Sequence, residues 1–287
     1  MHHHLGQLTP ESVEKASGDE TAPTIEAAHG GILDNASLTN YVDEIGQRAR
    51  SGSTRRAYPH QFRVLAAEKV INAFALGNGN VYVTKGLLNL LDDEAELAFV
   101  LSHEIGHVEK RHIAYAIDQA VSAGLILSIV EGLATSQSQS AKDLVGAFGS
   151  AAADVVLLGF GRERELEADE LGLEHSAGAG YDPYGAVRVF RKFQTLAPES
   201  AGLQIYMDSH PTASRRISDL EAEIRMKFPD GTGATRANRF KSIVKEGVPY
   251  SPLPIEEAAK YTGSGSSVAI PIAAGALIVA GAGVLLA

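Results

Sequence analysis

Two histidines four residues apart, with a glutamate directly after the first, are the strongest chemical signal in this sequence. They lie in the stretch LSHEIGHVEK as His103, Glu104 and His107. Residues four apart on an α-helix share a face, so both imidazoles can point at one metal ion, while Glu104 is rotated by about a hundred degrees and can reach a water molecule beside it. The pattern predicts half of a zinc site if it lies on a helix; the alternative is a pair of ordinary exposed histidines.

The residues around this motif predict the helix that it needs. Asp93 and Glu96 have the spacing of a capping box, which marks the start of a helix. Apolar residues then recur at helical spacing at Leu97, Val100, Leu101, Ile105 and Val108. A catalytic zinc ion on this helix would still need a third protein ligand and an open position for water.

The same segment does not supply the third ligand in the way that metzincin proteases do. Their pattern requires Gly at position 110 and His at position 113, but this chain has Lys110 and Ile113. His112 is one place short of the required position. The third ligand must therefore come from elsewhere in the chain.

An acidic segment downstream, GRERELEADELGLEHSAGAG, offers candidate ligands. Glu165 and Asp169 stand four apart in it, and Ala168 and Gly172 lie near the same side, where small residues let one helix approach another closely. One carboxylate could bind the metal while the other orients a ligand. A solvated acidic surface is the alternative, but burying carboxylates without a cation is costly, and the first helix favours the ligand interpretation.

Composition narrows the chemistry further. The 287-residue chain has no cysteine, so it has neither disulfides nor a thiol nucleophile, and a metal site must use histidines and carboxylates. A net charge of -10 and the lack of a basic run argue against a nucleic-acid partner. With 45% hydrophobic residues, the chain can build a proper core.

The region upstream of the histidine motif predicts a small sheet. The stretches FRVLAA and VINAFALGNGNVYVT are rich in β-branched and aromatic residues, and GNGN at 77–80 supplies the residues that a tight hairpin turn requires. We expect residues 62–84 to form a small antiparallel β-sheet. Because the other periodic segments read as helices, the fold class is α+β and mainly α-helical.

The two ends of the chain differ from the middle. MHHH at the start resembles a tag remnant, so these histidines are left out of the metal argument, and no native targeting segment is visible. We expect residues 1–30 to be this remnant and a loosely held polar lead-in. Residues 31–228 are expected to form the folded domain, residues 229–266 a polar extension and linker, and residues 267–287 an apolar tail.

Two apolar segments each have alternative interpretations. The tail at 267–287 has no charge and is long enough to cross a bilayer, which predicts a membrane anchor, but its many Ala and Gly residues and Pro271 also fit a buried or disordered end. The stretch at 113–160 holds two apolar runs that are too short for membrane spans. It predicts a helical hairpin beside the cleft, as a lid or as a membrane-facing surface.

Four motifs in this order resemble the M48 family of metallopeptidases: NAFALGNGNVYVTKGLL, HEIGH, ELEAD and SHPTASRRI. The resemblance covers about residues 40–228 and is closest to bacterial envelope members that act in outer-membrane assembly. It implies a zincin-like fold of the gluzincin type. It also implies that Glu165 is the third zinc ligand and that Asp169 supports a ligand histidine, whereas Glu167, inside the same motif, is not a ligand.

The resemblance assigns roles to further residues. Arg162 matches an arginine that precedes the ligand glutamate in the family and is expected near the ligands, although Gly161 replaces the usual serine. His210 is expected at the active site, where it either stabilises the reaction intermediate or binds the zinc and silences the enzyme. Around the strand that borders the cleft, Asn72, Ala73 and Phe74 are expected to pair with an extended peptide; an ordinary hairpin is the alternative.

The function implied is that of a zinc-dependent endopeptidase with one Zn²⁺ per chain, bound by His103, His107 and Glu165. Glu104 would act as the base, and unfolded or extended polypeptides would be the substrates. The resemblance places such an enzyme in the bacterial cell envelope, periplasmic or membrane-associated, in protein quality control. The alternatives are a silent or self-inhibited relative that binds misfolded chains, and a membrane-tethered scaffold. The presence of Glu104 favours the enzyme, because a silent relative has no need of the base.

Overall fold

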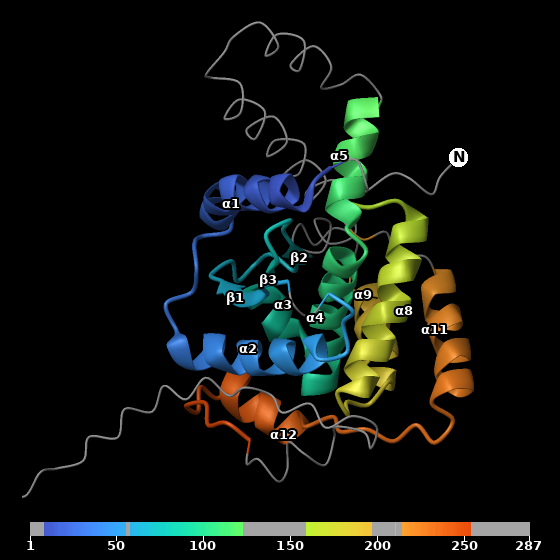
Figure 1. The fold of residues 1–287 in the computed structure, drawn as a ribbon. Coiled ribbons are helices and arrows are strands. Elements are labelled where there is room, and N and C mark those ends of the chain that lie inside the picture. The colour runs from blue at the N-terminus through green and yellow to red at the C-terminus, as the bar shows by residue number, and fades with distance from the viewer. Residues whose placement is uncertain (1–8, 56–57, 123–158, 197–209, 211–213, 254–287) are drawn as a thin grey trace, which may run out of the picture.

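The computed structural model describes residues 9–55, 58–122, 159–196, 210 and 214–253. Most of the predicted hairpin at 113–160 and the apolar tail lie outside these residues, so both remain predictions. Within the described ranges, no helix combines the length and the hydropathy that a membrane span requires. The prediction of an α+β, mainly helical fold is confirmed (Figure 1).

A small three-stranded sheet lies between two N-terminal helices, α1 (Glu11–Ala28) and α2 (Ala36–Arg50) (Figure 1). Its strands are β1 (Gln61–Leu65), β2 (Ala73–Ala75) and β3 (Asn80–Thr84), in the order β1-β3-β2. Strands β2 and β3 form the predicted antiparallel hairpin, and Gly79 in its turn has φ +85°.

The prediction of a wholly antiparallel sheet is wrong, because β1 pairs with β3 in parallel. The stretch AAEKVIN at 66–72 contains no glycine or other tight-turn signal, so the chain does not fold back directly after β1. It crosses to the far side of β3 instead, and β2 enters there in the opposite direction. Strand β2 is therefore an edge of the sheet.

The histidine motif lies on α4 (Glu94–Glu109), the central helix of the fold. Its start is capped as predicted: Asp93 accepts the N–H of Glu96 (2.8 Å), and the Glu96 carboxylate accepts the N–H of Asp92 (2.8 Å). Every residue of α4 is buried. The helix packs against α2, β2, α8 (Arg162–Gly178) and α9 (Tyr184–Thr195), which surround it (Figure 1).

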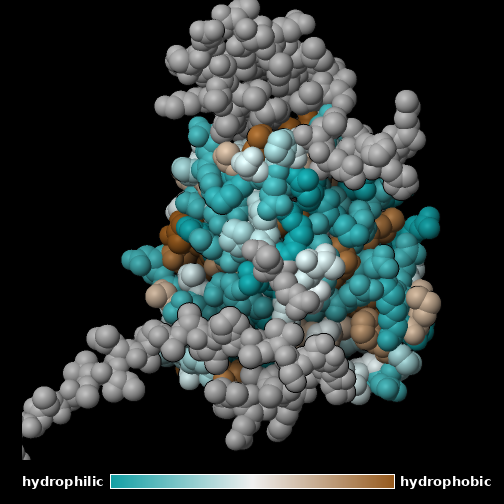
Figure 2. Space-filling view, viewed as in Figure 1, coloured by the Kyte–Doolittle hydropathy of each residue, from teal (hydrophilic) through white to brown (hydrophobic). Residues whose placement is uncertain are grey.

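Shorter elements complete the described fold. These are α3 (Lys85–Leu90), α5 (His112–Ser122), α11 (Ser214–Lys227), α12 (Ala237–Phe240) and a π-helical turn at Lys241–Lys245. Figure 2 shows this face of the molecule as mainly hydrophilic, with small and separated apolar patches. Most large apolar side chains of the described residues are instead in the core around α4.

The N-terminal segment is not the loosely held lead-in that its polar composition predicts. Glu11–Ala28 forms α1, and Ala22 and Ile25 on this helix join a buried cluster with Phe74 and Tyr82 of the sheet. The Tyr82 hydroxyl also donates to the Glu26 carboxylate (2.7 Å). A few apolar residues are enough here, because the helix lies on a sheet face that supplies the rest of the apolar surface.

The stretch after residue 228 also differs from the polar extension that was expected. Phe240, Ile243 and Val244 are buried in the main core. Arg239 donates to Glu94 at the start of α4 (2.8 Å) and to Glu44 of α2 (3.0 Å), so it connects this segment to two helices. The folded domain therefore extends beyond the predicted boundary.

Small residues bring α4 and α8 close together. A Cβ added to Gly172 of α8 would lie 3.1 Å from the backbone nitrogen of His103, and one added to Gly106 of α4 would lie 3.2 Å from the Cα of Ala168. Both distances are shorter than ordinary van der Waals contacts. The two helices that carry the candidate ligands thus cross with backbone nearly against backbone, as the small residues in the acidic segment predict.

We expect Gly172→Val to lower the free energy of unfolding by about 1–3 kcal/mol, because the added methyl groups must force α8 away from α4. Gly178→Val is the matched control, because a side chain at Gly178 on the same helix meets no other atom nearby. Its effect should stay within about 0.5 kcal/mol. Urea denaturation measures both, and equal effects of the two substitutions would contradict the close helix crossing.

Candidate metal centre

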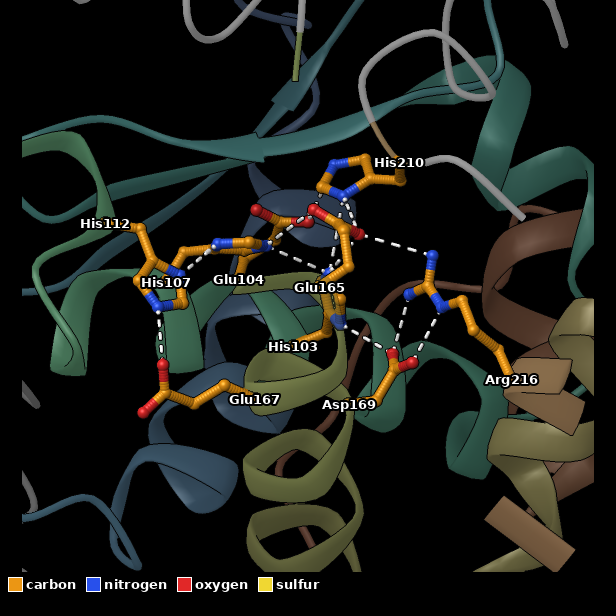
Figure 3. Close-up of polar contacts among 9 residues, drawn as sticks. All are labelled: His103, Glu104, His107, His112, Glu165, Glu167, Asp169, His210 and Arg216. Atoms are coloured by element: carbon orange, nitrogen blue, oxygen red, sulfur yellow. Dashed lines mark hydrogen bonds and ion pairs between the residues drawn. The ribbon is translucent and has the colours of Figure 1, made fainter. Parts of the chain in front are cut away.

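Three predicted ligands converge at the crossing of α4 and α8 (Figure 3). The Nε2 atoms of His103 and His107 lie 3.0 Å apart. The carboxylate of Glu165 lies 3.5 Å from each of these nitrogens, with Oε2 nearer His103 and Oε1 nearer His107. All three side chains are buried. Two imidazole nitrogens and a carboxylate oxygen thus face one point from two helices.

The arrangement fits a divalent cation. The Oε1 atom of Glu165 is buried and has no hydrogen-bond partner in the described part of the chain. The Nε2 atoms of His103 and His107 face each other, and the opposite nitrogen of each ring has another polar partner. A buried carboxylate oxygen that lacks a donor is costly unless a cation compensates it. Two histidines and one carboxylate are a ligand set that zinc prefers.

Asp169 contacts the ring nitrogen of His103 that faces away from the predicted metal position. Its Oδ1 lies 3.0 Å from Nδ1 of His103, one helical turn after Glu165 on α8. This contact places the ring proton of His103 on Nδ1, so Nε2 keeps its lone pair for a metal. The predicted supporting role of Asp169 fits this position.

Arg216 of α11 neutralises the acidic side of the site. Its guanidinium donates twice to the Asp169 carboxylate, at 2.7 Å each, and lies 3.2 Å from Oε2 of Glu165 (Figure 3). Arg162, the arginine expected near the ligands, is instead exposed in the first turn of α8. The arginine beside the ligands thus comes from a helix far along the chain.

The charges within the site are strongly coupled. Burial alone would lower the pKa of His103, but the carboxylates of Asp169 and Glu165 raise it to about 9. Burial would raise the pKa of Glu165, but the charge of His210 and hydrogen bonds from His103 and His210 hold it well below its usual value. Burial lowers the pKa of His107 well below its usual value. The site therefore combines an ionised Glu165 with a protonated His103 and a neutral His107, and a metal ion at Nε2 of His103 would displace a proton.

Glu104 lies beside the predicted ligands but is not part of the cluster that could hold a metal (Figure 3). It is buried, its Oε1 has no hydrogen-bond partner in the described structure, and its carboxylate accepts the backbone N–H of Ala75 on β2. Burial raises the pKa of Glu104 above its usual value. A carboxyl group with a raised pKa next to a metal site is suited to accept and release a proton.

His210 also lies in this site. Its Nδ1 lies 3.0 Å from Oε2 of Glu165 and 3.3 Å from Nε2 of His103, and its Nε2 lies 3.6 Å from the Glu104 carboxylate. His210 and the three predicted ligands can place one ligand atom each within 4.8 Å of one another. The structure thus brings His210 to the position where it could act either on substrate or on the metal.

Strand β2 lies beside the site, and among the described residues its second edge pairs with no other strand, although the N–H of Ala75 on this edge donates to Glu104. The carbonyl of Asn72 accepts the N–H of Thr84 (3.0 Å), and Phe74 lies opposite Tyr82, so the main chain of both residues faces β3. In an antiparallel pair the residues between these point their N–H and C=O groups the other way. Of the predicted trio, Ala73 is therefore the residue whose backbone points away from β3.

Sequence reasoning missed two groups at this site. Arg216 belongs to the SHPTASRRI motif, but helical spacing alone does not reveal that its side chain reaches α8. His112 lies with Nδ1 2.7 Å from Nδ1 of His107, and its Nε2 lies 3.1 Å from the Glu167 carboxylate. The sequence signal was a histidine five residues after His107, which helical spacing does not place on the same face.

Comparison with known proteins shows which family the chain matches. The model of the family described as Peptidase family M48 matches residues 36–224. The chain is 29% identical over 237 residues to the beta-barrel assembly-enhancing protease of Yersinia pestis, with 80% of this chain and 48% of that protein covered. It is 30% identical over 204 residues to the protein of the same name from Escherichia coli strain K12, with 69% of this chain and 41% of that protein covered.

A eukaryotic relative is also similar. The mitochondrial metalloendopeptidase OMA1 of Arabidopsis thaliana is 34% identical over 149 residues, which cover 52% of this chain and 28% of that protein. The chain spans less than half the length of these relatives. The similarity therefore covers only part of each of these relatives.

We expect Glu165→Gln to lower the zinc content of the purified protein well below the wild-type value, because an amide oxygen carries no charge to bind the cation. Glu163→Gln is the matched control, since Glu163 is exposed in the first turn of the same helix. Elemental analysis of the dialysed proteins measures the effect. A normal zinc content in the Glu165 variant would show that this carboxylate is not a ligand.

Proposed function

Because the chain belongs to peptidase family M48, we propose that it is a zinc-dependent endopeptidase with a zincin-like catalytic domain, which cleaves unfolded or extended polypeptides. The observation that carries the proposal is the convergence of His103, His107 and Glu165 on one point, with Glu104 beside them. A structural metal site needs its ligands, but it does not need a further buried carboxylate such as Glu104, which neither binds the metal nor supports a ligand side chain. The presence of Glu104 is thus the feature that favours catalysis.

The roles of the residues follow from their positions. A zinc ion bound by the three ligands would lower the pKa of a coordinated water molecule and polarise the peptide carbonyl. The Glu104 carboxylate takes the proton of the attacking water and delivers it to the nitrogen of the leaving amine. Its raised pKa suits both steps, because the group must hold the proton between them. Asp169 and Arg216 keep His103 and Glu165 in place throughout.

Strand β2 supports the proposed substrate class. The edge of β2 that faces away from β3 can pair with the backbone of an extended peptide, which gives affinity without demanding a particular sequence. The backbone of Ala73 faces this edge, and the buried Oδ1 of Asn72 has no hydrogen-bond partner in the described structure. Only a segment without secondary structure of its own can form such a pairing. The enzyme would therefore prefer unfolded or extended chains.

A self-inhibited state is the second candidate function, and His210 is the observation that favours it. Its ring nitrogen approaches Glu165 and His103 as closely as the ligands approach one another. A fourth protein ligand would fill the position that a catalytic site keeps open for water. In this proposal the ring of His210 leaves the ligand set before substrate binds, and it then faces Glu104 and the substrate.

The cellular context is proposed from the relatives. Two of them are named for the assembly of β-barrels and one is a mitochondrial metalloendopeptidase, so a role in the quality control of envelope proteins is consistent with these names. We place the protein in the bacterial cell envelope, periplasmic or membrane-associated. The apolar tail at 267–287 would provide the membrane association. A chain that ends at Gly263, before this tail, should then purify without detergent.

We expect Glu104→Gln to reduce casein hydrolysis by about 10²–10⁴-fold while zinc content and folding stay normal, because the variant loses the proton acceptor but keeps every ligand. Casein is a suitable substrate because it is unfolded. The exposed Glu163→Gln variant should cleave at the wild-type rate. Equal cleavage by wild type and Glu104→Gln would remove this residue from its proposed role.

We expect Ala73→Pro to raise the KM for an extended peptide by about fivefold, the effect of losing one hydrogen bond of about 1 kcal/mol. The substitution removes an N–H that the sheet does not use, so the zinc content should not change. Ala36→Pro is the matched control, because Ala36 is the exposed first residue of α2, where proline is tolerated. Steady-state kinetics measures KM, and an unchanged value for Ala73→Pro would separate β2 from substrate binding.

A further inference from the structure

A second buried histidine stands directly behind His107. The Nδ1 atoms of His107 and His112 lie 2.7 Å apart, and Nε2 of His112 lies 3.1 Å from Oε2 of Glu167 (Figure 3). Both rings are almost completely buried. The three side chains come from three helices, α4, α5 and α8, so they form a polar chain that ends at a predicted metal ligand.

The directions of the hydrogen bonds in this chain follow from the metal site. If Nε2 of His107 binds a cation, the ring proton must be on Nδ1, which then donates to Nδ1 of His112. Because that nitrogen accepts, the proton of the His112 ring must be on Nε2, which faces the Glu167 carboxylate. This one arrangement gives each ring nitrogen of His112 and the Nδ1 of His107 a hydrogen-bond partner.

The corner between α4 and α5 places His112 for this contact. Arg111 at the corner has φ +57°, a left-handed conformation that is uncommon for a residue with a side chain. Its guanidinium donates to Glu14 (2.9 Å) and to the carbonyl of Thr9 (2.6 Å), both at the start of the N-terminal segment. These contacts hold the chain in the turn that brings His112 back over His107.

Neighbouring groups hold Glu167 and His107, the two outer members of this hydrogen-bonded series, in place. Lys110 lies 3.1 Å and Arg164 lies 3.3 Å from the Glu167 carboxylate, and both cations favour its ionised form. Phe160 stacks on the ring of His107, with centroids 4.2 Å apart and an angle of 19° between the planes. This stacking covers one face of the imidazole, so the ring has little freedom to rotate away from His112.

We propose that His112 and Glu167 are positioning residues of the metal centre, which hold the ring of His107 and the proton on its Nδ1 so that Nε2 is directed at a divalent cation. The inference rests on the metal centre of the proposed function. It gives each ligand histidine its own support on its far nitrogen, Asp169 for His103 and the His112–Glu167 pair for His107. It also explains why Glu167, which is not among the converging ligands, is bound to a buried ring.

The experiment measures zinc affinity of the full chain by competition with a chelator, so its result does not depend on peptidase activity. We expect His112→Leu to weaken zinc binding by about 10–100-fold, the usual effect of losing such a partner. His112→Asn should recover most of this loss, because the Asn Oδ1 can accept the proton in place of the His112 Nδ1. Glu167→Leu should weaken binding less than His112→Leu, since the bond to His107 remains.

A similar pair elsewhere provides the matched control. His175 of α8 lies 2.9 Å from the Glu109 carboxylate of α4, and both side chains are buried but do not contact a predicted ligand. His175→Leu should therefore keep the zinc affinity of the wild type even if it lowers stability. The absorption spectrum of the cobalt-loaded protein reports the ligand geometry independently, and it should change in His112→Leu and not in His175→Leu.

The outcomes separate this inference from the proposed function. Wild-type zinc affinity in His112→Leu would overturn the positioning role and leave the metal centre intact. Equal losses in His112→Leu, His112→Asn and His175→Leu would also overturn it, because they would show a general effect on folding. If the wild-type chain itself binds no zinc, the metal centre fails and the inference fails with it. Tight zinc binding without casein hydrolysis would contradict only the enzymatic proposal.

Discussion

The close crossing of α4 and α8 is the constraint on which the rest of the site depends. Gly106 and Gly172 leave no room for a side chain between the two backbones. Only at this separation can a carboxylate as short as that of Glu165 reach a point between two imidazoles on the other helix. The sheet, α2 and α9 enclose α4 on its remaining sides, which fixes the helix in depth and rotation.

A second condition is the balance of buried charge. Glu104, Glu165 and Asp169 lie together in the core, and repulsion among them would be severe without cations. Arg216 compensates two of them, and the histidines compensate the third in part. The groups that contact the two predicted ligand histidines differ in kind: His103 contacts an aspartate that is paired with an arginine, and His107 contacts a second histidine that is paired with a glutamate. The two imidazoles therefore differ in basicity, although both belong to one helical motif.

Local patterns predicted the parts of the site that lie within single elements. The capping box, the helical spacing of α4 and the small residues of α8 depend on neighbouring residues, and the structure has each of them. Contacts between distant elements carry no such signal. The sequence predicted Arg162 beside the ligands, but the packing of α11 against α8 places Arg216 there, and no local pattern predicts that packing. The parallel pairing of β1 and the burial of α1 also depend on how the elements meet, so composition and turn signals could not predict them.

The left-handed turn at Arg111 connects the N-terminal segment to the candidate metal site. Glu14 and Thr9 accept hydrogen bonds from this arginine and contact none of the predicted ligands. The corner that they hold nevertheless positions His112 against His107. A truncated chain that starts at residue 36, where the family match begins, would retain the three predicted ligands and lose these contacts to Arg111. The contacts that hold this corner therefore come from residues before the family match, so the support of the candidate metal site extends into the N-terminal segment.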